Sequence, residues 1–157
     1  MSSRPNRGVT LIEVLVAVAI AAILAGLAAP QFTQSIARTR LEGAVSTLGI
    51  DLQYVRSEAI HRRTNASLVV AADGASYDVR YTPTSGADVV LKTVTLPAGV
   101  TLSAGTVVFE GLRGTTTAQT LTGSSSYTSA QLQVTTNAFG RIATCSPSAA
   151  FHGYTAC

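Results

Sequence analysis

The sequence lacks Trp, and only 6% of its 157 residues are aromatic and 12% are charged. Ordinary soluble domains carry about 25% charged residues. A charged fraction this small does not build the dense basic face of a nucleic-acid-binding domain, although the formal net charge is +3. Intrinsic disorder is excluded as well, because 46% of the residues are hydrophobic. The length favours a single compact domain.

Residue types for catalysis and metal binding are scarce. His61 and His152 are the only histidines, and Cys145 and Cys157 are the only cysteines. The serines at 124–126 have no nucleophile-elbow context, and the sequence shows no carboxylate pair and no glycine-rich phosphate loop. We therefore expect no enzymatic activity, no cofactor and no metal site. His61 is expected at a helix C-terminus, where its partial charge suits the helix dipole.

A long apolar run dominates the N-terminal part of the sequence. Residues 11–29 contain one charged member, Glu13, and follow a basic stretch that includes Arg4 and Arg7. A helix of these nineteen residues rises about 28 Å, close to the thickness of the hydrocarbon core of a bilayer. Basic residues ahead of such a run place the N-terminus in the cytoplasm. We therefore expect a transmembrane helix, with the chain beyond Pro30 in the periplasm.

A cleaved secretory signal peptide is the alternative interpretation of the run. Residues 25–29 offer small side chains for cleavage, and a soluble β domain would then be secreted. Glu13 argues against this alternative, because a carboxylate within an apolar span costs about 2–3 kcal/mol and such residues are functional by default. A mature N-terminus at Val9, rather than near Pro30, distinguishes the two interpretations.

The start of the apolar run carries a family signature. Residues 8–16 are GVTLIEVLV: a glycine, a hydrophobic residue, Thr-Leu-Ile-Glu and an apolar run. This segment resembles the prepilin signature of type IV pilins and type II secretion pseudopilins. The resemblance implies that prepilin peptidase cleaves between Gly8 and Val9 and N-methylates Val9, where the family usually has Phe. It also implies that Glu13 neutralises the N-terminus of a neighbouring subunit during assembly.

The physical chemistry of Glu13 is consistent with that role. Cleavage after Gly8 exposes an α-ammonium on Val9, and Glu13 lies four residues later, near the positive end of the helix dipole. The carboxylate then has a cation to pair with, either in its own chain or in a neighbouring one. Small residues later in the run, such as Ala22 and Gly26, either allow close helix packing or simply fill the span.

A second helical pattern follows Pro30, which should kink the helix or interrupt it briefly. Beyond Pro30, apolar residues recur at spacings of three and four, which predicts one helix face packed against a sheet. These residues are Leu41, Val45, Leu48, Leu52, Val55 and Ala59. We therefore expect one long kinked helix from near Val9 to about His61.

The remaining sequence is typical of strands. Runs rich in Val, Thr, Ser and Tyr are separated by turn signals and lie at 67–71, 77–82, 89–95, 106–110, 131–135 and 141–145. We expect an antiparallel β domain packed on the helix, with a flexible loop at 123–126. The predicted fold class is α+β. It has a leader at 1–8, a transmembrane helix at 9–29, its periplasmic continuation at 30–63 and a periplasmic β domain at 64–157.

Internal motifs extend the resemblance over most of the chain. They are RSEAIHRR at 56–63, LPAGV at 96–100, Val108-Phe109 and Gly140-Arg141-Ile142. Together they resemble the GspH/FimT family of minor pilins and pseudopilins. The resemblance implies a type IV pilin-like fold and a low-abundance subunit. Such a subunit acts with other pilin or pseudopilin subunits and the inner-membrane assembly machinery to initiate a type IV pilus or a type II secretion pseudopilus.

The two cysteines predict a disulfide. In an oxidising periplasm, Cys145 and Cys157 form an even pair, and a bond between them would close a short loop and stabilise the fold by about 3 kcal/mol. Two free thiols are the alternative.

A DNA-binding receptor at a pilus tip is the alternative function. Some members of the resembled family bind DNA through Gly-Arg-x-Arg, and this chain has Gly140 and Arg141 but Ala143 in place of the second arginine. Loss of the leader lowers the net charge to 9 − 8 = +1, and residues 64–157 carry four basic and four acidic side chains. Because phosphate binding needs several convergent cations, we expect Arg141 to pair locally or to be solvated.

Overall fold

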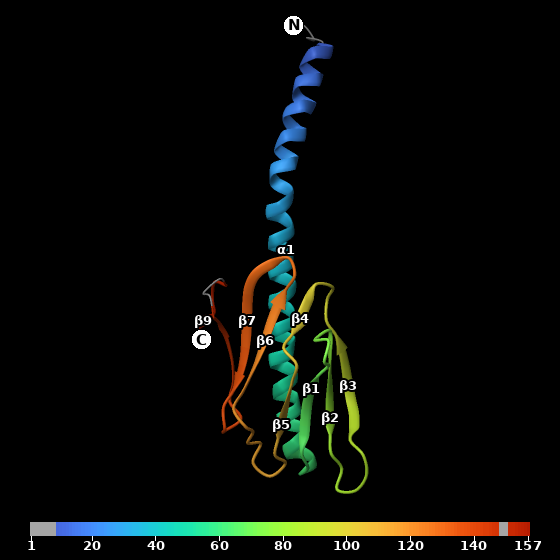
Figure 1. Ribbon diagram of the computed structural model, residues 1–157, viewed down its shortest axis with the longest axis vertical. Coiled ribbons are helices and arrows are strands. Elements are labelled where there is room, and N and C mark those ends of the chain that lie inside the picture. The colour runs from blue at the N-terminus through green and yellow to red at the C-terminus, as the bar shows by residue number, and fades with distance from the viewer. Residues whose placement is uncertain (1–8, 148–150) are drawn as a thin grey trace, which may run out of the picture. The chain divides into compact units, whose positions relative to one another are not determined.

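The computed structural model describes residues 9–147 and 151–157, with residues 27–30 described by their backbone alone. The predicted leader, including Gly8, lies outside the described residues. The chain forms two compact units, Met1–Ser35 and Ile36–Cys157, and one helix, α1 (Leu11–Arg62), contributes residues to both. Within the described residues, nine strands follow α1 and belong to the second unit (Figure 1).

The start of α1 is marked by Thr10. The backbone amides of Glu13 and Val14 donate to the Thr10 carbonyl at 3.1 and 3.3 Å, so Thr10 is the N-cap and the helix begins two residues after the expected Val9. The helix continues through Pro30, so the brief interruption allowed for at this residue does not occur. A proline removes one helical hydrogen bond, and the bonds of the neighbouring turns are enough to keep the backbone helical.

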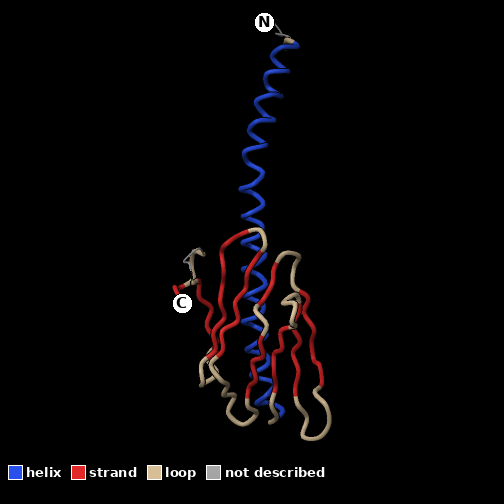
Figure 2. The backbone as a smooth tube through the Cα atoms, in the orientation of Figure 1, coloured by secondary structure: helices blue, strands red, loops and turns tan. Residues whose placement is uncertain are grey.

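The strands form two sheets. The first has the order β3-β2-β1-β5 and is formed by β1 (Ala66–Val70), β2 (Ser76–Tyr81), β3 (Val89–Thr95) and β5 (Gly105–Phe109). The second has the order β4-β6-β7-β8-β9 and is formed by β4 (Val100–Leu102), β6 (Gln119–Ser125), β7 (Thr128–Thr136), β8 (Ile142–Ser146) and β9 (Thr155–Ala156). Figure 2 shows these strands running alongside the C-terminal part of α1.

The predicted antiparallel pairing is confirmed for every strand pair except the last. β8 and β9 pair in parallel, with Cys145 opposite Thr155. The six predicted strand segments are present, the one at 89–95 with the predicted ends and the other five with shifted ends, whereas β4, β6 and β9 were not predicted. β4 and β9 are only three and two residues long, too short for an alternating pattern to be recognised.

The flexible loop predicted at 123–126 is wrong, because β6 includes Gly123 and pairs it with Leu132 of β7. A Cβ atom at Gly123 would lie 2.6 Å from Cγ2 of Val45 on α1. The glycine is therefore a contact between strand and helix, where the absence of a side chain lets the two approach. The composition GSSS hides this strand, since glycine and serine are also typical of loops.

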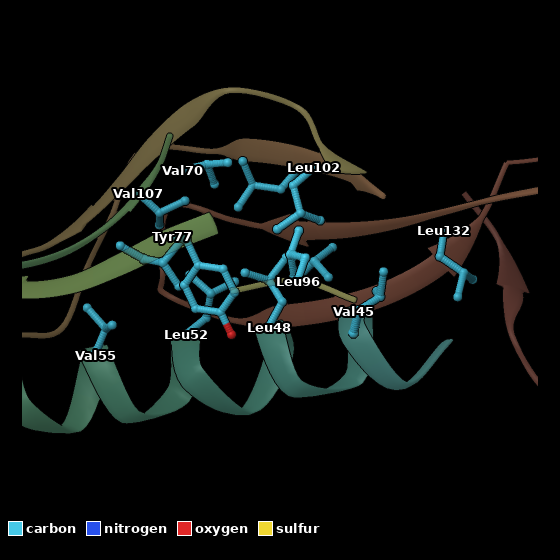
Figure 3. Close-up of a cluster of buried hydrophobic side chains, with 14 of the residues drawn as sticks. Val45, Leu48, Leu52, Val55, Val70, Tyr77, Leu96, Leu102, Val107 and Leu132 are labelled. Carbon is cyan, nitrogen blue, oxygen red and sulfur yellow. The ribbon is translucent and has the colours of Figure 1, made fainter. Parts of the chain in front are cut away.

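The hydrophobic core lies between the second part of α1 and the two sheets. All six predicted stripe residues are buried, with Leu41, Leu48, Leu52, Val55 and Ala59 fully inaccessible. Figure 3 shows Val45, Leu48, Leu52 and Val55 directed from one helix face toward side chains of both sheets, including Tyr77, Val107, Leu102 and Leu132. The predicted packing of the stripe against a sheet is confirmed, and one core holds the second unit together.

Candidate functional sites

The apolar part of α1 is exposed from Leu11 to Gly26. Among the described residues, α1 is the one helix long and apolar enough to span a membrane, and its most apolar window has a mean hydropathy of 2.7 with none of it buried. The large apolar side chains from Val9 to Leu24 are all at least half exposed. An exposed apolar surface of this extent needs a lipid or protein environment.

Glu13 lies in the first turn of this apolar helix. Its side chain is exposed, and no hydrogen bond or ion pair joins its carboxylate to another described residue. Val9 lies just before the helix and is 69% exposed. Position N3 of a helix favours a negative charge, because the backbone amides of the first turn and the helix dipole are positive there. The single chain thus presents an anion and an apolar surface that it does not itself cover.

A second candidate site is a hollow beside the C-terminal part of α1. It has a volume of about 470 Å³ and is lined by Gln53, Arg56, Ser57 and Ile60 of α1 and by residues 139–142 of the β7–β8 connection. Arg141 is exposed and forms no ion pair with another described residue, and Phe139 is 80% exposed. The two arginines give this hollow a positive charge.

Arg56 holds the loop that presents Arg141. Its Nη2 donates to the carbonyl of Phe139 at 3.3 Å, and its Nε is buried without a hydrogen-bond partner among the described atoms. Gly140 packs on this guanidinium with φ at +74°, and a Cβ there would lie 2.2 Å from the Gly114 carbonyl oxygen. The glycine of the Gly140-Arg141-Ile142 motif is therefore required by packing and by its backbone conformation.

Asn137 orders the same turn. Its Oδ1 accepts hydrogen bonds from the backbone amides of Phe139 and Arg141, at 3.1 and 2.9 Å. Side-chain to backbone bonds of this kind are the usual mechanism by which asparagine initiates turns. The predicted turn at 137–140 is confirmed, whereas the contribution of Arg56 from another element has no signal in the sequence.

A buried polar cluster connects α1 to the first sheet. Asp51 is 5% exposed. Its carboxylate accepts a hydrogen bond of 2.7 Å from the Tyr77 hydroxyl, and Lys92 Nζ donates to its two oxygens at 2.8 and 2.9 Å. Burial raises the pKa of Tyr77 strongly, and its hydrogen bond to Asp51 raises it further. Asp51 is not one of the six apolar residues of the stripe, yet its side chain is buried with them. The Asp51 carboxylate can be buried because the Tyr77 phenol and the Lys92 ammonium satisfy its hydrogen-bonding capacity and its charge.

The predicted disulfide between Cys145 and Cys157 is present, with a Cα–Cα distance of 5.0 Å, and no described cysteine is free. The described residues of the loop that it closes include two that pack against the domain. Phe151 is buried in the core, and the Tyr154 hydroxyl donates to Glu42 Oε1 of α1 at 3.1 Å. His152 is exposed, and within the described part of the chain no three His, Cys, Asp or Glu side chains gather as for a metal ion.

Two family models match the chain. The prokaryotic N-terminal methylation motif matches residues 3–29, and the type II transport protein GspH matches residues 44–140. A search of curated proteins finds no match to the sequence.

Solved structures show a similar fold. The type IV minor pilin FimU of Pseudomonas aeruginosa is 23% identical with a TM-score of 0.56, and the match covers 67% of this chain and 87% of FimU. The minor pseudopilin EpsH from the type 2 secretion system of Vibrio cholerae is 16% identical with a TM-score of 0.60, and the match covers 69% of this chain and 98% of EpsH. The predicted type IV pilin-like fold is thereby confirmed.

Proposed function

The chain belongs to the GspH family of minor pilins and pseudopilins of type IV pili and type II secretion, and we propose that it is an inner-membrane prepilin that helps to initiate such a filament. In this proposal prepilin peptidase cleaves after Gly8 and methylates Val9. The mature chain then assembles with other pilin or pseudopilin subunits. The second unit lies in the periplasm and presents a surface to partner subunits.

The exposed carboxylate of Glu13 on an uncovered apolar helix is the observation that carries the proposal. Lipid covers the apolar surface before assembly and neighbouring helices cover it afterwards. The N-terminal ammonium of an adjacent subunit supplies the missing cation. Pairing the two charges offsets the cost of a carboxylate in an apolar environment, about 2–3 kcal/mol.

The proposed orientation has the N-terminus in the cytoplasm. Arg4 and Arg7 precede the apolar run, and positive charge is retained on the cytoplasmic side. The disulfide between Cys145 and Cys157 supports a periplasmic location for the second unit, because disulfides persist in oxidising compartments.

Two measurements test the proposal. Mass spectrometry of the chain purified from membranes should show an N-terminus at Val9 carrying one methyl group. An N-terminus near Pro30 would show instead a discarded signal peptide. In sheared filament fractions, Glu13→Ala should lower incorporation about tenfold or more while its membrane level stays the same. The matched control Glu110→Ala removes an exposed carboxylate of the second unit and should incorporate normally.

DNA binding at a pilus tip is a second candidate, favoured by the hollow that Arg56 and Arg141 share with the exposed ring of Phe139. Guanidinium groups bind phosphate, and an exposed aromatic ring can stack on a base. In fluorescence anisotropy with the full mature chain in detergent, this function requires binding to a DNA duplex at physiological salt. Arg141→Ala should weaken it, and Arg38→Ala, which lies earlier on α1 and outside the lining of the hollow, should not. Equal binding by all three proteins contradicts a site at this hollow.

A further inference from the structure

Strand β3 is an open sheet edge. Among the described strands it pairs with β2 alone, so the backbone groups on its other side have no strand partner. It is seven residues long, and Val89 and Val90 are 40% and 49% exposed. Natural edge strands are usually protected by short length, proline or outward-pointing lysine. β3 contains no proline, and its one lysine, Lys92, binds Asp51 of the helix.

Two hollows lie between this edge and α1. The first has a volume of about 360 Å³, and the second of about 430 Å³. The first is lined by Arg40, Gly43 and Thr47 of α1, by Val94 of β3 and by Leu96, which follows β3. The second is lined by Ile50 and Tyr54 of α1 and by Leu91 of β3, with the pair of Asp51 and Lys92. We refer to these two hollows and the free edge of β3 together as the edge groove.

An extended strand fits the edge groove better than a helix. A strand paired with β3 supplies the hydrogen bonds that the free edge lacks, which a helix does not. Successive side chains of a strand point to opposite faces, and every second one projects to the same side about 6.6 Å further along. One row of side chains would then face α1 and reach the two hollows. Because most of the lining is aliphatic or aromatic, that row is apolar.

The charges of the edge groove favour an acidic residue at one end of the occupant. Arg40 is exposed at the first hollow and forms no ion pair with another described residue. Lys92 is neutralised by Asp51 at the second hollow. The uncompensated charge of the groove is therefore positive and lies at the end where Arg40 is found. A carboxylate on the occupant complements it.

We infer that the edge groove binds an extended strand of a neighbouring, different filament subunit, apolar at alternate positions and acidic at the end near Arg40. The inference rests on the proposed function, because the filament supplies the neighbouring subunit. A second copy of this chain is the poorer occupant. Antiparallel pairing of two β3 strands about their centre is a two-fold contact that closes on itself, whereas a filament is built from head-to-tail contacts between subunits.

Photo-crosslinking in assembled filaments tests the inference. A photoreactive phenylalanine analogue replaces Val90 on β3 in the full-length chain, and a second variant carries it at Leu112, which is 75% exposed in the β5–β6 connection. We expect the Val90 variant to form an adduct with a different subunit, at a segment that alternates apolar residues and contains Asp or Glu. Arg40→Glu should lower the yield of that adduct about tenfold.

The matched control Arg38→Glu reverses an exposed charge two residues earlier and outside the groove lining, and should leave the adduct unchanged. A filament-incorporated chain that yields no Val90 adduct, an adduct with a second copy, or an adduct insensitive to Arg40→Glu overturns the inference alone. A chain absent from the filament fraction overturns the proposed function, and the inference with it.

Discussion

The hydroxyl of Tyr77 in β2 donates a 2.7 Å hydrogen bond to the carboxylate of Asp51 in α1. Lys92 of the adjacent strand β3 binds the same carboxylate. One helical acid is thus shared by two neighbouring strands and fixes the first sheet on the helix at one position along its axis. Apolar contacts alone are less directional. This cluster therefore sets the position of the sheet as well as contributing to stability.

Removing Asp51 should destabilise the domain more than removing either donor. Asp51→Ala leaves the Tyr77 hydroxyl buried without an acceptor, so we expect a loss of about 2–4 kcal/mol in the free energy of unfolding. Tyr77→Phe removes one hydrogen bond and leaves Lys92 on the acid, so we expect about 1 kcal/mol. Urea unfolding of the full chain in detergent, followed by circular dichroism, measures both. Equal losses would show that Asp51 acts through the Tyr77 hydrogen bond alone and that its pair with Lys92 adds no stability.

The raised pKa of Tyr77 predicts alkaline sensitivity. The unfolded chain releases the phenol proton near the ordinary tyrosine pKa of 10.0, whereas burial holds that proton in the folded chain. The contribution is therefore complete below this pH and is lost as the pH rises above it, at up to about 1.4 kcal/mol per pH unit. Urea midpoints at about pH 8 and about pH 11 should diverge more for the wild type than for Tyr77→Phe. Tyr154, whose pKa is also raised, leaves some dependence in the variant.

The sequence was sufficient to predict the helix stripe, six strands, the disulfide and the pilin-like fold. Each of these has a local signal: periodicity in the stripe from Leu41 to Ala59, turn residues between strands, and a single pair of cysteines. The missed features depend on contacts between distant elements. Gly123 is a strand residue because Val45 approaches it, and Arg56 joins the site of Arg141 although the two lie 85 positions apart in sequence.

The contact between Gly123 and Val45 predicts a compensating pair of substitutions. Gly123→Ala brings a methyl group to within 2.6 Å of Val45 Cγ2, so we expect a loss of about 1–3 kcal/mol. Adding Val45→Ala frees space, and the double variant should lose less than the sum of the single losses. Gly49→Ala is the control, because its nearest atom is 3.9 Å away and alanine favours helix. Additive losses would contradict direct contact.

Loss of the disulfide should destabilise the domain and release the segment between Cys145 and Cys157 from its contacts. Reduction, or Cys145→Ser with Cys157→Ser, opens the loop and should cost about 3 kcal/mol. It should also free Tyr154 from Glu42, which is observable as faster proteolysis after residue 146. The double serine variant should not respond to reductant. If reductant changes the stability or the proteolysis of that variant, its effect on the wild type is not due to this bond alone.

Gly140 has both a positive φ and no room for a Cβ atom, whereas Gly153 has only the positive φ. Both Gly140 and Gly153 have positive φ, at 74° and 90°, but a Cβ at Gly153 meets nothing within 4 Å. Gly153→Ala should therefore cost only the backbone strain, about 1 kcal/mol. Gly140→Ala adds a clash with the Gly114 carbonyl at 2.2 Å and should cost about 3 kcal/mol or more. The clash must also displace the loop that presents Arg141, so nuclear magnetic resonance shifts should change at residues 114 and 137–142. Equal costs for the two variants would mean that φ alone selects glycine here.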